Sequence, residues 1–130
     1  MRLGRLNTSL ILDEVQEYMN VDKHVLLQKS IDPVYNIPYT NSLFEKYQMY
    51  SSRIMCLRPK TCYTVHRDQT PRIHFPIITD KRCLFILEDH AFYMEKGWAH
   101  YVDTTKSHSA LNGTMDLFRY HIVGKTDEIL

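Results

Sequence analysis

Residues 83–123 carry the strongest indication of the fold, and they read CLFILEDHAFYMEKGWAHYVDTTKSHSALNGTMDLFRYHIV. Short apolar runs in this stretch are separated by turn-forming residues, as at Glu95-Lys96-Gly97 and Asn112-Gly113. No helical period lies between the runs, so parallel strands joined by helices are excluded. A strand every ~8–12 residues is typical of an all-β sandwich or barrel.

The same pattern of short apolar runs separated by turns extends towards the N-terminus as far as about residue 52. Pro76 falls inside one of the expected strands and therefore predicts a sheet edge or a bulge there. The sequence predicts eight strands: Arg53–Leu57, Cys62–Arg67, Arg72–Thr79, Cys83–Leu87, Ala91–Met94, Trp98–Val102, Ser107–Leu111 and Leu117–Val123.

The first 50 residues differ, because apolar residues at helical spacing predict a helix over 10–20, capped by Ser9. Prolines indicate a loop over 31–41, and a second short helix is expected over 42–50. We therefore predict an all-β core with N-terminal helices, arranged as a double-stranded β-helix, that is, a jelly-roll or cupin-like barrel. One domain of 130 residues is expected, with a helical and loop part over 1–50 and the jelly-roll core over 51–124.

Charge and cysteine content narrow the function classes. Sixteen Lys and Arg against fifteen Asp and Glu give a net charge of +1, which argues against a nucleic-acid partner bound through a basic face. No apolar run is long enough for a membrane span, and the three cysteines lack CxxC spacing, which indicates reduced thiols. We expect a cytoplasmic protein with a small-molecule or peptide substrate and no membrane partner.

His66-Arg67-Asp68 is the first candidate for chemistry. In a strand, residues i and i+2 point to the same face, so an imidazole and a carboxylate converge. Together they supply two ligands of a 2-His-1-carboxylate facial triad, which holds Fe(II) and leaves coordination positions open. On its own this short motif is more typical of a surface pair near a turn.

A third ligand must come from another part of the chain. If 112–115 forms a four-residue loop, His108 falls directly opposite Arg119, so both could face one cavity. A guanidinium there would suit the far carboxylate of a dicarboxylic cosubstrate. The histidines available as the third ligand are His74, His90, His100, His108 and His121.

The ordered set of motifs resembles the aspartyl/asparaginyl β-hydroxylase-like group of Fe(II)/2-oxoglutarate dioxygenases. Members carry a first metal histidine, then an Arg-x-His strand, then a distal metal histidine with an arginine about ten residues later. The matching positions here are His66, Arg72 with His74, His108 and Arg119. The resemblance covers residues 53–124, over half of the chain.

The resemblance implies a role for each of these residues. His66, Asp68 and His108 would bind Fe(II), and Arg119 would pair with the far carboxylate of 2-oxoglutarate. Arg72 and His74 would make a second contact to this cosubstrate, and O2 would be the oxidant. Some hydroxylases of the group lack the carboxylate ligand of the metal, whereas Asp68 is present here. Its presence also disfavours halogenation, because related halogenases leave the carboxylate position free for a halide.

The resemblance therefore predicts a 2-oxoglutarate-dependent non-haem iron oxygenase that hydroxylates an Asp, Asn or Pro residue or a small polar molecule. Two other functions fit a jelly roll. One is a cupin-like metal isomerase or lyase, although such proteins normally show His-x-His with a later Glu. The other is a non-catalytic binding module in which the triad is coincidental.

Overall fold

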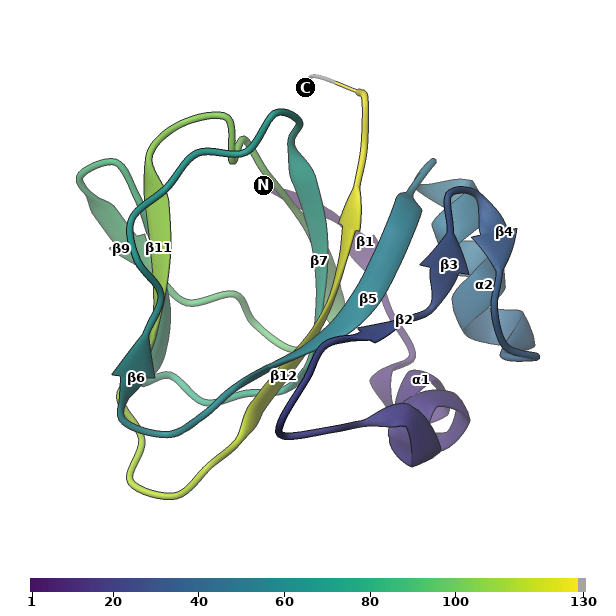
Figure 1. Ribbon diagram of the computed structural model, residues 1–130, viewed down its shortest axis with the longest axis horizontal. Coiled ribbons are helices and arrows are strands. Elements are labelled where there is room, and N and C mark those ends of the chain that lie inside the picture. The colour runs from purple at the N-terminus through teal and green to yellow at the C-terminus, as the bar shows by residue number, and fades with distance from the viewer. Residues whose placement is uncertain (129–130) are drawn as a thin grey trace.

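The structure, a computed structural model, describes residues 1–128, and its two main sheets face each other as the walls of a barrel (Figure 1). Every pair of neighbouring strands is antiparallel. The larger sheet has the order β1 (Arg2–Arg5), β10 (Trp98–Val102), β7 (Arg72–Ile78), β12 (Arg119–Lys125), β5 (Tyr50–Leu57) and β2 (Val25–Leu26). The smaller sheet has the order β6 (Thr61–Cys62), β11 (His108–Asn112), β8 (Cys83–Leu87) and β9 (His90–Phe92). This arrangement is the predicted jelly-roll barrel.

Both predicted helices are present, but both begin earlier than expected. Helix α1 spans Thr8–Val15 and continues into a short 3-10 turn, η1 (Gln16–Tyr18). Its cap is Asn7 rather than Ser9, because the Asn7 side chain accepts a hydrogen bond from the Leu10 N–H at 3.1 Å. Helix α2 spans Pro38–Lys46, and proline fits its first turn, where the missing N–H needs no partner.

The main apolar core lies between the larger sheet and the two helices, which cover its outer face in Figure 1. On β7, alternate residues point to this core, and Phe75 stacks on Phe44 of α2 with ring centroids 6.2 Å apart. The other face of the same strand points between the two sheets. The larger sheet therefore has an apolar face outside the barrel and a polar face inside it.

Several local predictions need correction. The expected Cys62–Arg67 strand is reduced to β6, followed by one isolated bridge between His66 and His108. Gly97 does form a turn, with a φ of 95°, but β9 and β10 on its two sides belong to different sheets. Pro76 lies in a central strand rather than at an edge, and the predicted bulge is present as a register shift opposite Tyr120 and His121.

The N-terminal region also contains strands that the sequence did not indicate. Strand β1 pairs with β10 at the edge of the larger sheet, and a small hairpin of β3 (Gln28–Lys29) and β4 (Asp32–Pro33) interrupts the expected loop. His100 is buried in β10, and Cys62 is an exposed free thiol. None of the helices within residues 1–128 is long and apolar enough to cross a membrane.

Candidate metal centre

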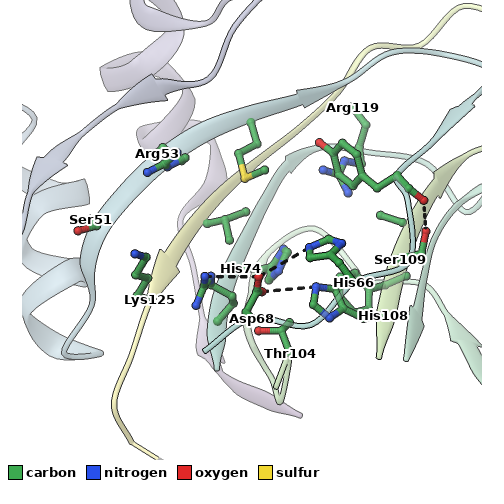
Figure 2. A pocket seen from close by; sticks show the side chains of 16 residues that line it. Ser51, Arg53, His66, Asp68, His74, Thr104, His108, Ser109, Arg119 and Lys125 are labelled. Atoms are coloured by element: carbon green, nitrogen blue, oxygen red, sulfur yellow. Dashed lines mark hydrogen bonds and ion pairs between the residues drawn. The ribbon is translucent and has the colours of Figure 1, made fainter. Parts of the chain in front are cut away.

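His66, Asp68 and His108 meet at one wall of the barrel interior. One potential ligand atom from each residue lies within 4.8 Å of the others. The Asp68 carboxylate faces both rings from one side, with Oδ1 3.7 Å from His66 Nε2 and Oδ2 3.4 Å from His108 Nε2 (Figure 2). Two backbone hydrogen bonds of 3.0 Å between His66 and His108 hold the two chain segments together. The structure thus brings together the three residues proposed as ligands from the sequence.

Both imidazoles are oriented so that Nε2 is the free nitrogen. His66 Nδ1 lies 2.8 Å from the Thr64 carbonyl oxygen, and His108 Nδ1 lies 2.9 Å from the Lys106 carbonyl oxygen. Since a carbonyl oxygen only accepts, each Nδ1 carries a proton, and Nε2 is the nitrogen that faces Asp68. A backbone carbonyl on the far nitrogen is the usual support of a metal-binding histidine.

The three side chains differ in exposure. His108 is 6% exposed and Asp68 19%, whereas the His66 side chain is 48% exposed, so the cluster opens to solvent on the His66 side. Phe85 of β8 stacks against the His108 ring, with centroids 5.6 Å apart. One imidazole is therefore fixed within the barrel, and the other stands at its mouth.

Arg72 at the start of β7 holds the carboxylate in place. One of its terminal nitrogens lies 3.6 Å from Asp68 Oδ1, and another donates to the Thr70 carbonyl and hydroxyl at 2.8 and 2.6 Å. The Asp68 backbone N–H donates to the Thr104 carbonyl at 2.8 Å. Burial lowers the pKa of Arg72, and the neighbouring Asp68 carboxylate opposes that shift. Arg72 therefore orients Asp68; the cosubstrate contact expected of it stays a prediction.

Arg119 lies on β12, away from the cluster, and is almost completely buried at 4% exposure. Its Nε has no hydrogen-bond partner within residues 1–128, and neither has the buried Tyr63 hydroxyl. Burial lowers the pKa of Arg119, yet a guanidinium remains charged at neutral pH. An unpaired charge and an unpaired hydroxyl are costly to bury, so this end of the site is built for a ligand that accepts hydrogen bonds.

Tyr63 was missed at the sequence level. The chain contains nine tyrosines, and only the place of Tyr63 three residues before His66 distinguishes it from the others. Its carbonyl accepts a hydrogen bond of 2.6 Å from the Ser109 hydroxyl, which ties its segment to β11. Burial raises the pKa of the Tyr63 hydroxyl, so it is a neutral donor at physiological pH.

His74 of β7 and His121 of β12 form a buried pair, with their Nδ1 atoms 3.0 Å apart. Burial holds the pKa of both imidazoles well below the ordinary value, and the charge of Arg119 adds to the effect. Both rings are therefore neutral, and one Nδ1–H donates to the other Nδ1. His74 reaches the barrel interior, where its cosubstrate contact stays a prediction.

These residues surround one cavity of about 320 Å³. Arg119 and His108 lie in different sheets, since β12 pairs with β5 and β7 whereas β11 pairs with β6 and β8. The predicted hairpin that placed them opposite each other is therefore wrong, although both reach the same interior. The full lining is Ser51, Arg53, Met55, Tyr63, His66, Asp68, Arg72, His74, Phe85, Thr104, His108, Ser109, Ala110, Arg119, Val123 and Lys125.

Comparison with known proteins gives one family and one fold. The family model described as "Aspartyl/Asparaginyl beta-hydroxylase" matches residues 27–125. A solved structure of a Cupin 2 conserved barrel domain protein from Salinispora arenicola CNS-205 is similar, with a TM-score of 0.55 and 15% identity over 97% of this chain and 89% of that chain. At that identity the likeness concerns the barrel fold alone. The search of curated proteins gave no match.

Proposed function

Because the chain belongs to the aspartyl/asparaginyl β-hydroxylase family, we propose that it is an Fe(II)- and 2-oxoglutarate-dependent oxygenase that hydroxylates an unactivated C–H bond. One observation carries the proposal: the His66–Asp68–His108 cluster shares a cavity with a buried arginine that has no anionic partner among residues 1–128. A metal site alone would suit many cupins. A metal site with a buried, unpaired guanidinium suits a cosubstrate that has a carboxylate at its far end.

The donor set fits the metal. Two neutral imidazole nitrogens and one carboxylate form the facial triad of non-haem Fe(II) oxygenases, which leaves positions free for small ligands. His66 Nε2, His108 Nε2 and one Asp68 oxygen would hold the ion. When bound, iron with 2-oxoglutarate and O2 supplies an overall reaction in which substrate C–H becomes C–OH while 2-oxoglutarate becomes succinate and CO2.

The cavity residues also fit the cosubstrate. Arg119 would grip the far carboxylate through its guanidinium fork, and the Tyr63 hydroxyl would donate a further hydrogen bond. Arg72 keeps the Asp68 carboxylate oriented towards the two imidazoles. Phe85 and Val123 line the same space with apolar surface.

The test is an anaerobic titration of the Fe(II)-loaded protein with 2-oxoglutarate, followed by the metal-to-ligand charge-transfer absorption band. The wild-type protein should develop the band, and turnover in air should release succinate. A cupin-like isomerase or a non-catalytic module would give neither signal. Absence of the band in a protein that binds Fe(II) would overturn the proposal.

Arg119→Ala should raise the 2-oxoglutarate concentration needed for the band by about 30- to several-thousand-fold, because truncating one partner of a buried charge pair costs ~2–5 kcal/mol. Arg119→Lys should fall between wild type and Arg119→Ala, since lysine supplies the charge without the fork. Fe(II) binding should stay nearly intact in both. If Arg72→Ala loses cosubstrate binding and Arg119→Ala does not, the two arginines have the opposite roles.

A further inference from the structure

The proposed function assigns no role to two cationic side chains of the cavity, Arg53 and Lys125. Both line the cavity, and both are half-buried. Neither side chain makes a hydrogen bond or an ion pair within residues 1–128. In Figure 2 they lie with Ser51 at the left of the view, away from Arg119, which lies above the metal cluster at the right.

Strand register places this pair at a separate end of the cavity. Val123 of β12 is directly opposite Arg53 of β5, and Lys125 is directly opposite Arg72 of β7. Directly opposite residues share a face, so these cations point into the same interior. Arg119 lies four residues before Val123 on β12, a distance of about 13 Å along a strand.

This separation is too long for one cosubstrate molecule. A five-carbon dicarboxylate with C–C bonds of ~1.5 Å spans only about 5 Å between its ends. If Arg119 holds its far carboxylate and the metal cluster its other end, this dicarboxylate has no third carboxylate for Arg53 and Lys125. They face the part of the cavity where a second molecule must enter.

The charge of the cavity favours an anion there. Four cationic side chains line it against a single carboxylate, Asp68, which is already close to Arg72. A bound divalent metal and a dianionic cosubstrate would cancel each other and leave this positive excess in place. Cations in a partly buried cleft concentrate anions and form strong charge-assisted hydrogen bonds with them.

We propose, on the premise of the oxygenase function, that Arg53 and Lys125 bind an oxyanion of the substrate, so that the substrate is a small acid. A carboxylate or a phosphate would serve, because both accept from the guanidinium fork and from an ammonium group. Ser51 lines the same end and adds a hydroxyl. The pair thereby selects the substrate and holds its C–H bond beside the metal cluster.

The experiment uses a panel of amino acids and hydroxy acids in matched pairs: each carboxylic acid with its amide, and each phosphate monoester with its free alcohol. Binding is measured as thermal stabilisation at constant ionic strength, with and without anaerobic Fe(II) and 2-oxoglutarate. Succinate release in air is the second readout. The variant is Arg53→Gln with Lys125→Gln. Its control is Lys81→Gln with Lys96→Gln, which removes the same charge at exposed positions outside the cavity.

Acids or phosphates, and not their neutral partners, should stabilise wild type and control and stimulate succinate release. The cavity variant should lose at least about ten-fold in apparent affinity for them, since it lacks two charged donors. If carboxylates bind more tightly than phosphates, or the reverse, the class that binds more tightly identifies the oxyanion of the substrate. Three results would each overturn the anion site. The neutral partners could bind as tightly as the acids, no acid in the panel could bind, or the cavity variant could keep the wild-type affinity for acids.

Failure of the anion site is distinguishable from failure of the oxygenase function. The charge-transfer band with 2-oxoglutarate should appear in wild type, control and cavity variant alike, because Arg119 and the metal ligands are intact. A missing band in the wild type rejects the oxygenase. The preference for acids over amides, measured without metal, still decides the anion site in that case.

Discussion

The two faces of the larger sheet make opposite use of the same strands. On β7, Ile73, Phe75 and Ile77 enter the apolar core beneath the helices, whereas Arg72 and His74 line the cavity. On β12, Tyr120 and Ile122 belong to the core, and Arg119 lies on the other face. Because alternate residues of a strand point to opposite faces, each of these strands supplies core residues on one face and cavity residues on the other. Changes on one face should affect folding, and changes on the other should affect the site.

Changes at the candidate metal cluster, which lines the same cavity but lies outside the larger sheet, should have the largest effect of all. We expect His108→Ala, and likewise His66→Ala, to abolish Fe(II) binding or turnover, because the remaining ligands cannot complete the triad. Asp68→Ala should leave a weaker site with one anionic ligand fewer. The measurements are Fe(II) titration and succinate release, with circular dichroism to show a folded chain.

The exposed His90→Ala is the matched control, because His90 lies outside the cavity. Full activity in His108→Ala, with metal binding lost in His100→Ala or His74→Ala instead, would show that the distal ligand is another histidine.

The core face should respond in the opposite way to truncation. Phe75 is fully buried, stacks on Phe44 and meets the Tyr47 ring edge-on at 6.0 Å. Phe75→Ala should lower the free energy of unfolding by about 3–5 kcal/mol through lost transfer energy and a cavity. Urea denaturation measures the loss. The charge-transfer band of the molecules that remain folded should be unchanged, and an altered 2-oxoglutarate affinity would contradict the separation of faces.

A smaller effect on the free energy of unfolding is expected at Gly124, where the core face leaves no room for a side chain. A Cβ on Gly124 of β12 would lie 2.3 Å from Ser52 Oγ and 2.6 Å from Met49 Cε. Gly124→Ala should therefore destabilise the fold by roughly 1–3 kcal/mol, the usual cost of overpacking. Equal urea midpoints for Gly124→Ala and wild type would show that β5 and β12 adjust without cost.

The sequence predicted those parts of the site that depend on local geometry. His66 and Asp68 lie two residues apart, so a strand direction is enough to bring them together. His108 and Arg119 required the family's motif order, because the hairpin argument that joined them was wrong. The Asn112 side chain donates to the Leu57 and Leu117 carbonyls and accepts from Thr114, which turns the chain from one sheet to the other. Such side-chain contacts leave no periodic signal.

Contacts between distant strands explain the other misses. Strand β1 pairs with β10, which carries the buried His100, and an N-terminal strand of four residues gave no signal of its own. Arg53 and Lys125 carry the charge typical of solvated residues. Only the strand register shows that they lie on the face of the larger sheet that lines the cavity.

The smallest expected effect concerns the boundary between the faces, the His74–His121 pair. In the folded protein burial lowers the pKa of both imidazoles and keeps them neutral, helped at both by Arg119 and His100 and at His74 also by His108 and Arg72. In the unfolded chain each imidazole titrates near its ordinary pKa of about 6.5. Above that pH the pair is neutral in both states and gives stability no pH dependence. Below that pH the two imidazoles bind protons in the unfolded chain but stay unprotonated in the folded protein. The free energy of unfolding must therefore fall as the pH falls.

The slope from each imidazole cannot exceed one proton, or about 1.4 kcal/mol per pH unit. Urea unfolding of protein without added metal, from pH 7.5 down to pH 5.5, should therefore show a decline that begins near pH 6.5. His121→Gln removes one of the two titrating groups while keeping a polar partner for His74 Nδ1, so its decline should be shallower than that of wild type. His90→Gln removes an exposed histidine and should leave the slope unchanged. If both variants keep the wild-type slope, protonation of the pair does not oppose folding, and the cavity face contributes to stability in another way.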